Sequence, residues 1–236
     1  MAEKKPAPLL ILISAPSGAG KTTLCELLLQ ARPEMARAVT CTTREPRKGE
    51  VDGVDYYFLK AEDFLRRVQA GNFIENAQVY GNSYGLLKSE LLSKLRAGKD
   101  VLLNVDVQGA KTIRAAAEAE PELKRALVTV FLTTPSLEIL EARLKNRNAD
   151  DPADIKKRLA SAKQEVAQWK NFDYLVISTS KSEDLRRTLA VVEAEKMRVA
   201  RSHAPDMEYI TMELPAKIEP KKSTLVRKAK GNRSRQ

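Results

Sequence analysis

The stretch LLILISAPSGAGKTT, residues 9–23, joins a short apolar run to a glycine-rich loop. The run from Leu9 to Ile13 contains only leucine and isoleucine and lies between a proline and a serine, which is typical of a buried strand in a parallel sheet. Leucines at helical spacing follow the loop, beginning at Leu24. The sequence therefore predicts a strand, a loop and a helix in direct succession.

The loop has the composition of a phosphate-binding site. Gly18 and Gly20 allow backbone N–H groups to crowd around a phosphate, and Lys21 adds a point charge. The hydroxyl of Thr22 suits Mg²⁺, and the N-terminus of the following helix favours an anion. We predict contacts to a nucleotide triphosphate from Ala15, Pro16, Ser17, Gly18, Ala19, Gly20, Lys21, Thr22 and Thr23.

One position departs from the strict pattern of such loops, because Ala15 stands where the first glycine is usual. The flanking strand and helix keep the structural context that the motif requires. The alternative is a surface turn rich in glycine and serine, which would not need Lys-Thr at the start of a helix.

Composition indicates an ordinary soluble protein with one sizeable core, since 43% of the 236 residues are hydrophobic and 31% are charged. Cys25 and Cys41 form no disulfide framework and lack the spacing of a metal site, which fits a reducing cytoplasm. The basic N-terminus is followed by too short an apolar run for a signal peptide or a membrane span. We expect a cytoplasmic location.

The formal net charge of +10 is concentrated at the C-terminus. From Ala216 onward the chain has eight Lys or Arg residues, one acidic residue and little apolar periodicity. Such a segment cannot bury enough apolar surface to fold alone. Weak binding of this tail to RNA is one hypothesis, and a purely solvated tail is the simpler interpretation.

Residues 37–58 combine short β-prone runs with turn residues. Val39 to Thr43 and Tyr56 to Phe58 predict short antiparallel strands joined by tight turns. Arg44 and Arg47 lie between these runs, and arginine side chains match phosphate oxygens bidentately. The segment suits a bound monophosphate, and the alternative is a charged hairpin surface.

Several motifs together resemble the guanylate kinase family. They are APSGAGKT, TTREPRKGEVDGVDY, FIE, GNSYG and VDVQGA, in that order between about Leu9 and Arg201. The resemblance implies a kinase that binds GMP as phosphate acceptor. It also implies Mg²⁺ with ATP as co-substrate.

The resemblance assigns GMP contacts to Thr40, Arg44, Arg47, Tyr56, Glu75, Tyr84 and Asp106. Glu75 matches the carboxylate that accepts two N–H groups of guanine, a pair that adenine lacks. Two positions depart from the family. Leu86 replaces a hydroxyl that donates to guanine O6, and Asn104 replaces an aspartate.

Asp106 ends an apolar run at 101–105 that reads as a strand, so its carboxylate is expected at the edge of the sheet where ligands bind. The family suggests a contact either to the guanine amino group or to water bound by Mg²⁺. The sequence leaves both possibilities open.

Two predicted helices in residues 135–169 carry arginines that match the mobile lid of the family. The resemblance implies that Arg143, Arg147 and Arg158 act on the transferred phosphate together with Lys21 and Arg44. The alternative is that these lid arginines form surface ion pairs with Glu138, Glu141 or Glu165.

Strands near 9–13, 101–105, 127–132 and 174–177 alternate with helices, and a fifth strand is expected within 38–43. This order predicts a doubly wound parallel α/β sheet. The resemblance to nucleoside monophosphate kinases with a P-loop adds an inserted acceptor-binding α+β subdomain and a helical lid. The expected divisions are a flexible terminus (1–8), a kinase domain (9–201) and a basic tail (202–236), the domain comprising a core (9–36, 96–134 and 170–201), a GMP-binding subdomain (37–95) and a lid (135–169).

The expected activity is transfer of the ATP γ-phosphoryl group to GMP or dGMP. One alternative is an inactive module of the same family that binds phosphopeptides. Another is a related kinase that acts on a different phosphate acceptor, which the changes at Leu86 and Asn104 keep open. The sequence does not predict the oligomeric state.

Overall fold

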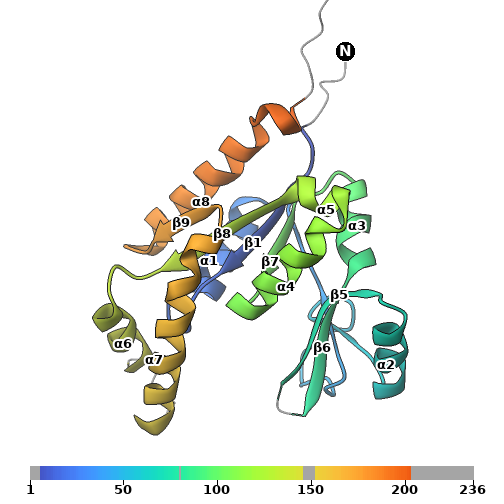
Figure 1. Ribbon diagram of the computed structural model, residues 1–236, viewed down its shortest axis with the longest axis horizontal. Coiled ribbons are helices and arrows are strands. Elements are labelled where there is room, and N and C mark those ends of the chain that lie inside the picture. Colours follow the sequence, from blue (N-terminus) through green and yellow to red (C-terminus); the bar gives the residue numbers. More distant parts are fainter. Residues whose placement is uncertain (1–5, 80, 146–151, 203–236) are drawn as a thin grey trace, which may run out of the picture. The chain divides into compact units, whose positions relative to one another are not determined.

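The core of the protein is a five-stranded sheet in which every pair of neighbours is parallel (Figure 1). A computed structural model describes residues 6–79, 81–145 and 152–202. The strand order is β2-β7-β1-β8-β9. The strands are β1 (Leu10–Ser14), β2 (Ala36–Arg37), β7 (Val101–Asn104), β8 (Leu127–Thr133) and β9 (Tyr174–Ile177). The predicted doubly wound α/β class is confirmed.

Alternate side chains of β1 enter two different hydrophobic layers, as the two-residue period of a strand requires. Ile11 and Ile13 pack in the layer that includes residues of α1 and α8. Leu10 and Leu12 pack in the layer that includes residues of α3, α4 and α5. These helices are α1 (Lys21–Ala31), α3 (Lys88–Arg96), α4 (Val107–Glu118), α5 (Pro121–Ala126) and α8 (Lys181–Lys196).

A second sheet has four strands in the order β4-β3-β6-β5. The strands are β3 (Thr40–Thr42), β4 (Tyr56–Phe58), β5 (Phe73–Val79) and β6 (Asn82–Leu87), with α2 (Ala61–Gln69) between β4 and β5 in the chain. β6 pairs antiparallel with both β3 and β5.

Two expectations for this segment are wrong. β3 pairs with β4 in parallel, because the long connection between them crosses over instead of making a tight hairpin. The strand expected within 38–43 also does not belong to the core sheet. The fifth core strand is β2, which pairs with β7, and the chain then leaves that sheet to form β3.

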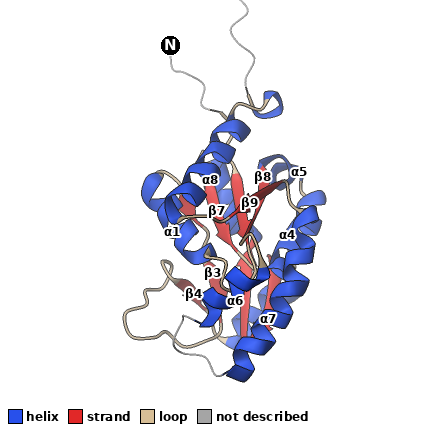
Figure 2. Ribbon diagram, turned by 90° about the vertical axis from the view of Figure 1, so that its left-hand side faces the viewer, coloured by secondary structure: helices blue, strands red, loops and turns tan. Residues whose placement is uncertain are grey.

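Helices α6 (Leu137–Lys145) and α7 (Pro152–Val166) contact each other beside the core sheet (Figure 2). The 3₁₀ segments η1 (Ala167–Asn171) and η2 (Val199–Arg201) follow α7 and α8. Arg147, His203 and the basic tail lie outside the described residues.

The carboxyl ends of β1 and β7, which are neighbours, lead into the glycine-rich loop and into Asp106. This edge of a parallel sheet is where ligands bind in open α/β folds. Within the described ranges, no helix is both long enough and apolar enough to cross a membrane.

Candidate functional site

The glycine-rich loop turns sharply between β1 and α1. Gly18 and Gly20 have φ angles of +89° and +102°, a region that favours glycine. A Cβ at Gly18 would lie 2.9 Å from Leu144 Cδ2. Glycine is therefore needed at this position both for backbone conformation and for the close approach of α6.

Lys21 connects the loop to the neighbouring strand. Its Nζ atom donates a hydrogen bond of 2.6 Å to the carbonyl oxygen of Val105. Burial lowers the pKa of Lys21, and the negative charges of Asp106 and Glu165 act in the opposite direction. The ammonium group is thus hydrogen-bonded at the carboxyl end of β7, in a region with the negative charges of Asp106 and Glu165.

Side chains of α6 and α7 both contact the glycine-rich loop. Arg143 of α6 donates from Nη1 to the carbonyl oxygen of Ala19 at 3.2 Å. Arg158 of α7 donates to Ser17 Oγ from Nε at 3.2 Å and from Nη2 at 3.0 Å. The backbone N–H of Ser17 donates to Glu165 Oε2 at 3.2 Å. Two of the three predicted lid arginines therefore contact the loop, and Arg147 is outside the described residues.

A cavity of about 380 Å³ opens beside the loop. Backbone of Gly18 and Gly20 lines one wall, and α1 contributes Leu24 and Leu27. Ser178, Asp184 and Arg143 line the rest together with Ser180 and Lys181. The cavity combines apolar side chains with a few polar groups, as sites for small ligands do.

Arg44 is the centre of a polar and aromatic cluster on the second sheet. Its Nη2 atom donates to both carboxylate oxygens of Glu50, at 2.8 and 2.9 Å, and this interaction raises the pKa of Arg44. The guanidinium lies 5.5 Å from the ring centroid of Tyr56. The rings of Tyr56 and Tyr84 meet edge to face with centroids 6.1 Å apart.

Strand register accounts for this cluster. Thr40 pairs with Tyr56 across β3 and β4, and Thr42 pairs with Tyr84 across β3 and β6. Residues two apart on β3 share one face, so these side chains lie on the same side of the sheet. Arg47 is exposed and joins the cluster through its backbone N–H, which donates to Glu50 Oε2 at 2.7 Å.

Glu75 and Asp106 bring two carboxylates together although they come from different sheets. A Cβ at Gly109 would lie 3.4 Å from Asp106 Oδ1 and 3.7 Å from Glu75 Oε2. Burial and, secondarily, the charge of Asp106 raise the pKa of Glu75. Asp106 also caps α4, because its Oδ1 accepts the N–H of Gly109 at 2.7 Å.

The two positions that depart from the family differ in their surroundings. Leu86 pairs with Glu75 in the sheet and is only 1% exposed, within the layer that contains Leu10 and Ile74. Its side chain fills the core and offers no hydrogen bond. Asn104 is exposed at the end of β7.

Sequence reasoning did not predict the contacts of three carboxylates in this region, and it considered Glu165 only as a surface ion-pair partner of the lid arginines. Glu50 lies in the GEVDG motif, but nothing local to it indicates a contact with Arg44. Glu165 follows Arg158 by seven residues, which is close to two helical turns, and that spacing could have placed both on one face of α7. Asp184 lies in the first turn of α8 and gave no signal beyond that of an acidic helix start.

A metal ion would find few protein ligands among the residues that the structure describes. Over the described ranges, no group of three or more His, Cys, Asp or Glu residues could hold a metal ion. Mg²⁺ often takes only one or two ligands from a protein and the remainder from substrate phosphates and water. The hydroxyl of Thr22 and the carboxylate of Asp106 fit that mode.

Comparisons with known proteins identify a family for this chain. A family model described as guanylate kinase matches residues 7–195. A guanylate kinase of Maricaulis maris is 38% identical over 189 residues, which are 80% of this chain and 84% of the relative. A guanylate kinase of Coxiella burnetii is 41% identical over 189 residues, 80% of this chain and 88% of the relative.

A solved structure leads to the same family. The crystal structure of guanylate kinase from Anaplasma phagocytophilum superposes with a TM-score of 0.63 at 30% sequence identity. The superposition covers 84% of this chain and 90% of the other. By sequence and by fold, this chain belongs to the guanylate kinase family.

Proposed function

We propose that the protein transfers the γ-phosphoryl group of ATP to GMP or dGMP, giving ADP and GDP or dGDP. The observation that carries the choice of acceptor is the carboxylate pair of Glu75 and Asp106. In the part of the chain that the structure describes, the half-buried Glu75 carboxylate has no hydrogen bond or ion pair to another residue. Its oxygens are therefore available to accept N–H donors from a ligand.

Guanine supplies such donors. Its N1–H and its 2-amino group are adjacent, so one carboxylate can accept both, and Asp106 lies close enough to share the amino group. Adenine has no adjacent pair of this kind. We therefore propose that Glu75 reads the base, that Asp106 assists it, and that Leu86 contributes only packing.

The acceptor phosphate is proposed to bind at Arg44, Arg47, Thr40, Tyr56 and Tyr84. Arg44 lies against the Tyr56 ring and beside Tyr84, and its guanidinium can bind a phosphate bidentately. In this structure the carboxylate of Glu50 accepts both hydrogen bonds from the Arg44 Nη2 atom, so the GMP phosphate must compete with Glu50 for this guanidinium.

The donor triphosphate is proposed to bind the loop from Ala15 to Thr23. Backbone N–H groups and Lys21 hold the phosphates, and the nucleoside occupies the adjoining 380 Å³ cavity. The hydroxyl of Thr22 would hold Mg²⁺, which shields phosphate charge when it is bound.

The residues of the chain act mainly by position and charge. A GMP phosphate is largely dianionic at pH 7, with a second pKa of about 6, so its oxygen attacks the γ-phosphorus without a general base. The bond from the γ-phosphorus to the bridging oxygen breaks, and ADP leaves. Arg143 and Arg158, with Arg147, are proposed to balance charge on the transferred group as residues 135–169 close and exclude water.

The direct test is ADP release in a coupled assay with ATP and Mg²⁺. GMP and dGMP should support turnover, whereas AMP and ribose 5-phosphate should not. The absence of any GMP-dependent ADP release would contradict the proposal and favour a binding module. Turnover with a ribose phosphate in place of GMP would favour a different acceptor.

A further inference from the structure

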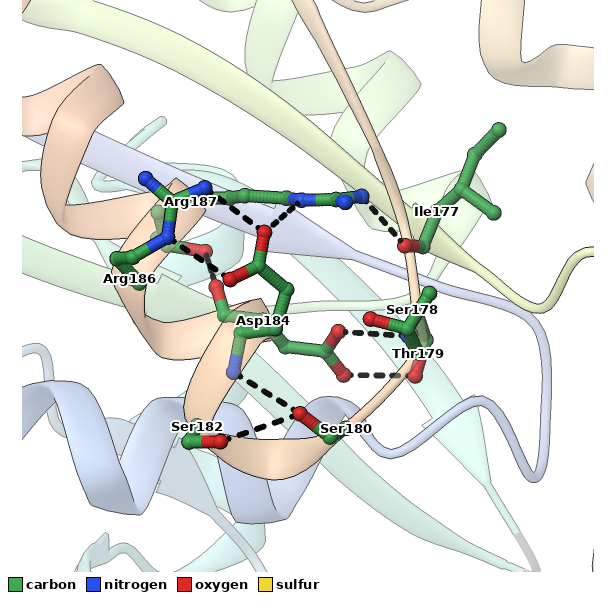
Figure 3. Close-up of polar contacts among 10 residues, drawn as sticks. Ile177, Ser178, Thr179, Ser180, Ser182, Asp184, Arg186 and Arg187 are labelled. Atoms are coloured by element: carbon green, nitrogen blue, oxygen red, sulfur yellow. Dashed lines mark hydrogen bonds and ion pairs between the residues drawn. The ribbon is translucent and has the colours of Figure 1, made fainter.

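The turn that joins β9 to α8 is fixed by a buried carboxylate that the proposed mechanism does not use (Figure 3). Asp184 is 7% exposed and lies in the first turn of α8. Its Oδ2 accepts the hydroxyl hydrogen of Ser178 at 2.6 Å, and its Oδ1 accepts the N–H of Thr179 at 3.1 Å. Each carboxylate oxygen therefore holds one of two consecutive residues of the turn.

The hydroxyl of Ser178 also contacts Arg143 of α6. Its hydroxyl has a single hydrogen, which it gives to Asp184, so its lone pairs are left to accept. Arg143 Nη1 donates to that oxygen at 3.1 Å. Without Asp184 the hydroxyl could rotate and donate elsewhere, and its lone pairs would no longer be directed at Arg143.

Arg143 is therefore held from two sides. The same Nη1 atom donates to the carbonyl oxygen of Ala19 in the glycine-rich loop. Arg143, Ser178 and Asp184 all line the cavity beside that loop. The orientation of the guanidinium at the donor site thus depends on a carboxylate 41 residues later in the chain.

We propose that Asp184 is a positioning residue for phosphoryl transfer, which acts through Ser178 to orient Arg143 toward the donor phosphates. This inference rests on the proposed function. Asp184 does not touch the reacting atoms, so its removal misplaces a charged group without removing it. A misplacement of this kind should lower kcat about 10- to 30-fold and leave the KM for GMP unchanged.

The first experiment compares Asp184→Ala, Asp184→Asn and Ser178→Ala with wild type. Asp184→Ala and Ser178→Ala should lower kcat by similar factors, because each variant breaks the chain of hydrogen bonds from Asp184 through Ser178 to Arg143. Asp184→Asn keeps one acceptor oxygen and should retain more activity than Asp184→Ala. Glu183→Ala is the matched control, since that carboxylate pairs with Arg186 and Arg187 and does not contact Ser178.

The deciding experiment is a double-mutant cycle with Arg143→Ala. If Asp184 acts through Arg143, then Asp184→Ala should change kcat by less than twofold in the Arg143→Ala background. Effects that multiply would overturn the proposal and assign Asp184 a general structural role. If Asp184→Ala does not fold, the cycle of Ser178→Ala with Arg143→Ala gives the same test.

Turnover of GMP by the full-length wild type separates failure of this inference from failure of the proposed function. A wild type that does not turn over GMP contradicts the proposed function. A wild type that turns over GMP, with Asp184→Ala equal to wild type in kcat, contradicts the positioning role alone.

Discussion

Each of the two proposed phosphate sites contains a carboxylate in the place where a substrate anion is expected. The two carboxylates differ in how far along the chain they lie from the group that they bind. Glu165 accepts the N–H of Ser17 in the glycine-rich loop, from 148 residues away. Glu50 accepts two hydrogen bonds from Arg44, from six residues away. One site is held by a separate helix, and the other is held by its own loop.

This difference indicates how each site should respond to its ligand. An ATP phosphate that takes the N–H of Ser17 breaks a contact between the loop and α7, so donor binding is coupled to that helix. A GMP phosphate that competes for Arg44 displaces only a neighbour in the same segment. Donor binding should therefore change the α6 and α7 pair, and acceptor binding should change the second sheet locally.

The largest effect is expected from Lys21→Ala, which removes the central charge of the donor site. We expect kcat to fall by about 10³-fold, because an oriented charge in a partly buried site contributes far more than in water. Initial rates of ADP release measure this. Lys124→Ala, which removes an equal charge from a surface ion pair, should have no effect. A Lys21→Ala variant with normal turnover would contradict the assignment of the glycine-rich loop as the ATP site.

Glu75→Gln tests the acceptor side of the comparison. An amide cannot accept two N–H groups as a carboxylate does, so kcat/KM for GMP should fall by about 10²-fold while ATP affinity is unchanged. Glu62→Gln on α2 is the control for loss of a negative charge. If the variant kept its full preference for GMP over AMP, the base contact assigned to Glu75 would be wrong.

The pH dependence of wild type and Glu75→Gln sharpens this test. Because the pKa of Glu75 is raised, its carboxylate becomes protonated at a higher pH than an ordinary glutamate does. The protonated group cannot accept both N–H groups of guanine, so kcat/KM for GMP should fall as the pH is lowered through this pKa. Ionisation of a group with a raised pKa costs stability as pH rises through that pKa. Glu75→Gln should therefore be more stable than wild type at pH 7, with a smaller difference near pH 4 in thermal unfolding.

Glu165→Gln addresses the difference between the two carboxylates directly. The variant removes a negative charge next to Ser17 and Lys21, so ATP should bind about 3- to 10-fold more tightly, with GMP affinity unchanged. Calorimetry measures both affinities. Glu50→Gln is the matched control and should leave ATP affinity unchanged. Weaker ATP binding by Glu165→Gln would contradict this prediction and would show that the Glu165 carboxylate stabilises the complex with ATP.

The sole tryptophan reports on the same coupling. Trp169 is 40% exposed in η1, directly after α7. Its fluorescence should change with ATP in wild type and change less in Glu165→Gln, because the contact that ATP breaks is already weakened. GMP alone should produce little change.

The smallest effect on activity is expected from Leu86→Thr, which restores a hydroxyl beside Glu75. The preference for GMP over AMP should rise about threefold, at a cost of about 2–3 kcal/mol in stability because a buried leucine is lost. Competition assays and thermal unfolding measure the two effects. Leu91→Thr, also fully buried, should lose similar stability with no change in preference.

The donor site was largely predictable because it is contiguous. Residues 9–23 contain the strand, the turn and the helix start, and each was identified from local composition alone. Three other core strands, β7, β8 and β9, were identified in the same way, since buried parallel strands are short apolar runs, whereas the two-residue β2 was not identified. The arginines of α6 and α7 required the family resemblance, because arginines on a helix are usually solvated.

The second sheet was harder to predict from its sequence. β3 and β4 each contain three residues, and such short runs do not specify whether their pairing is parallel or antiparallel. The long connection between them decided it. The register that gathers Thr40, Tyr56 and Tyr84 on one face likewise depends on pairing across three strands.

The sequence by itself determined the position of the glycine-rich loop and the α/β class, and the residues proposed to read GMP came from the family resemblance. Only the tertiary structure decided the hydrogen-bond partners of three carboxylates: Glu165 accepts from the Ser17 N–H, Glu50 from Arg44 and Asp184 from the Ser178 hydroxyl. Local backbone geometry follows from neighbours in the chain. Electrostatic partners follow from distance in space, which a linear sequence does not specify.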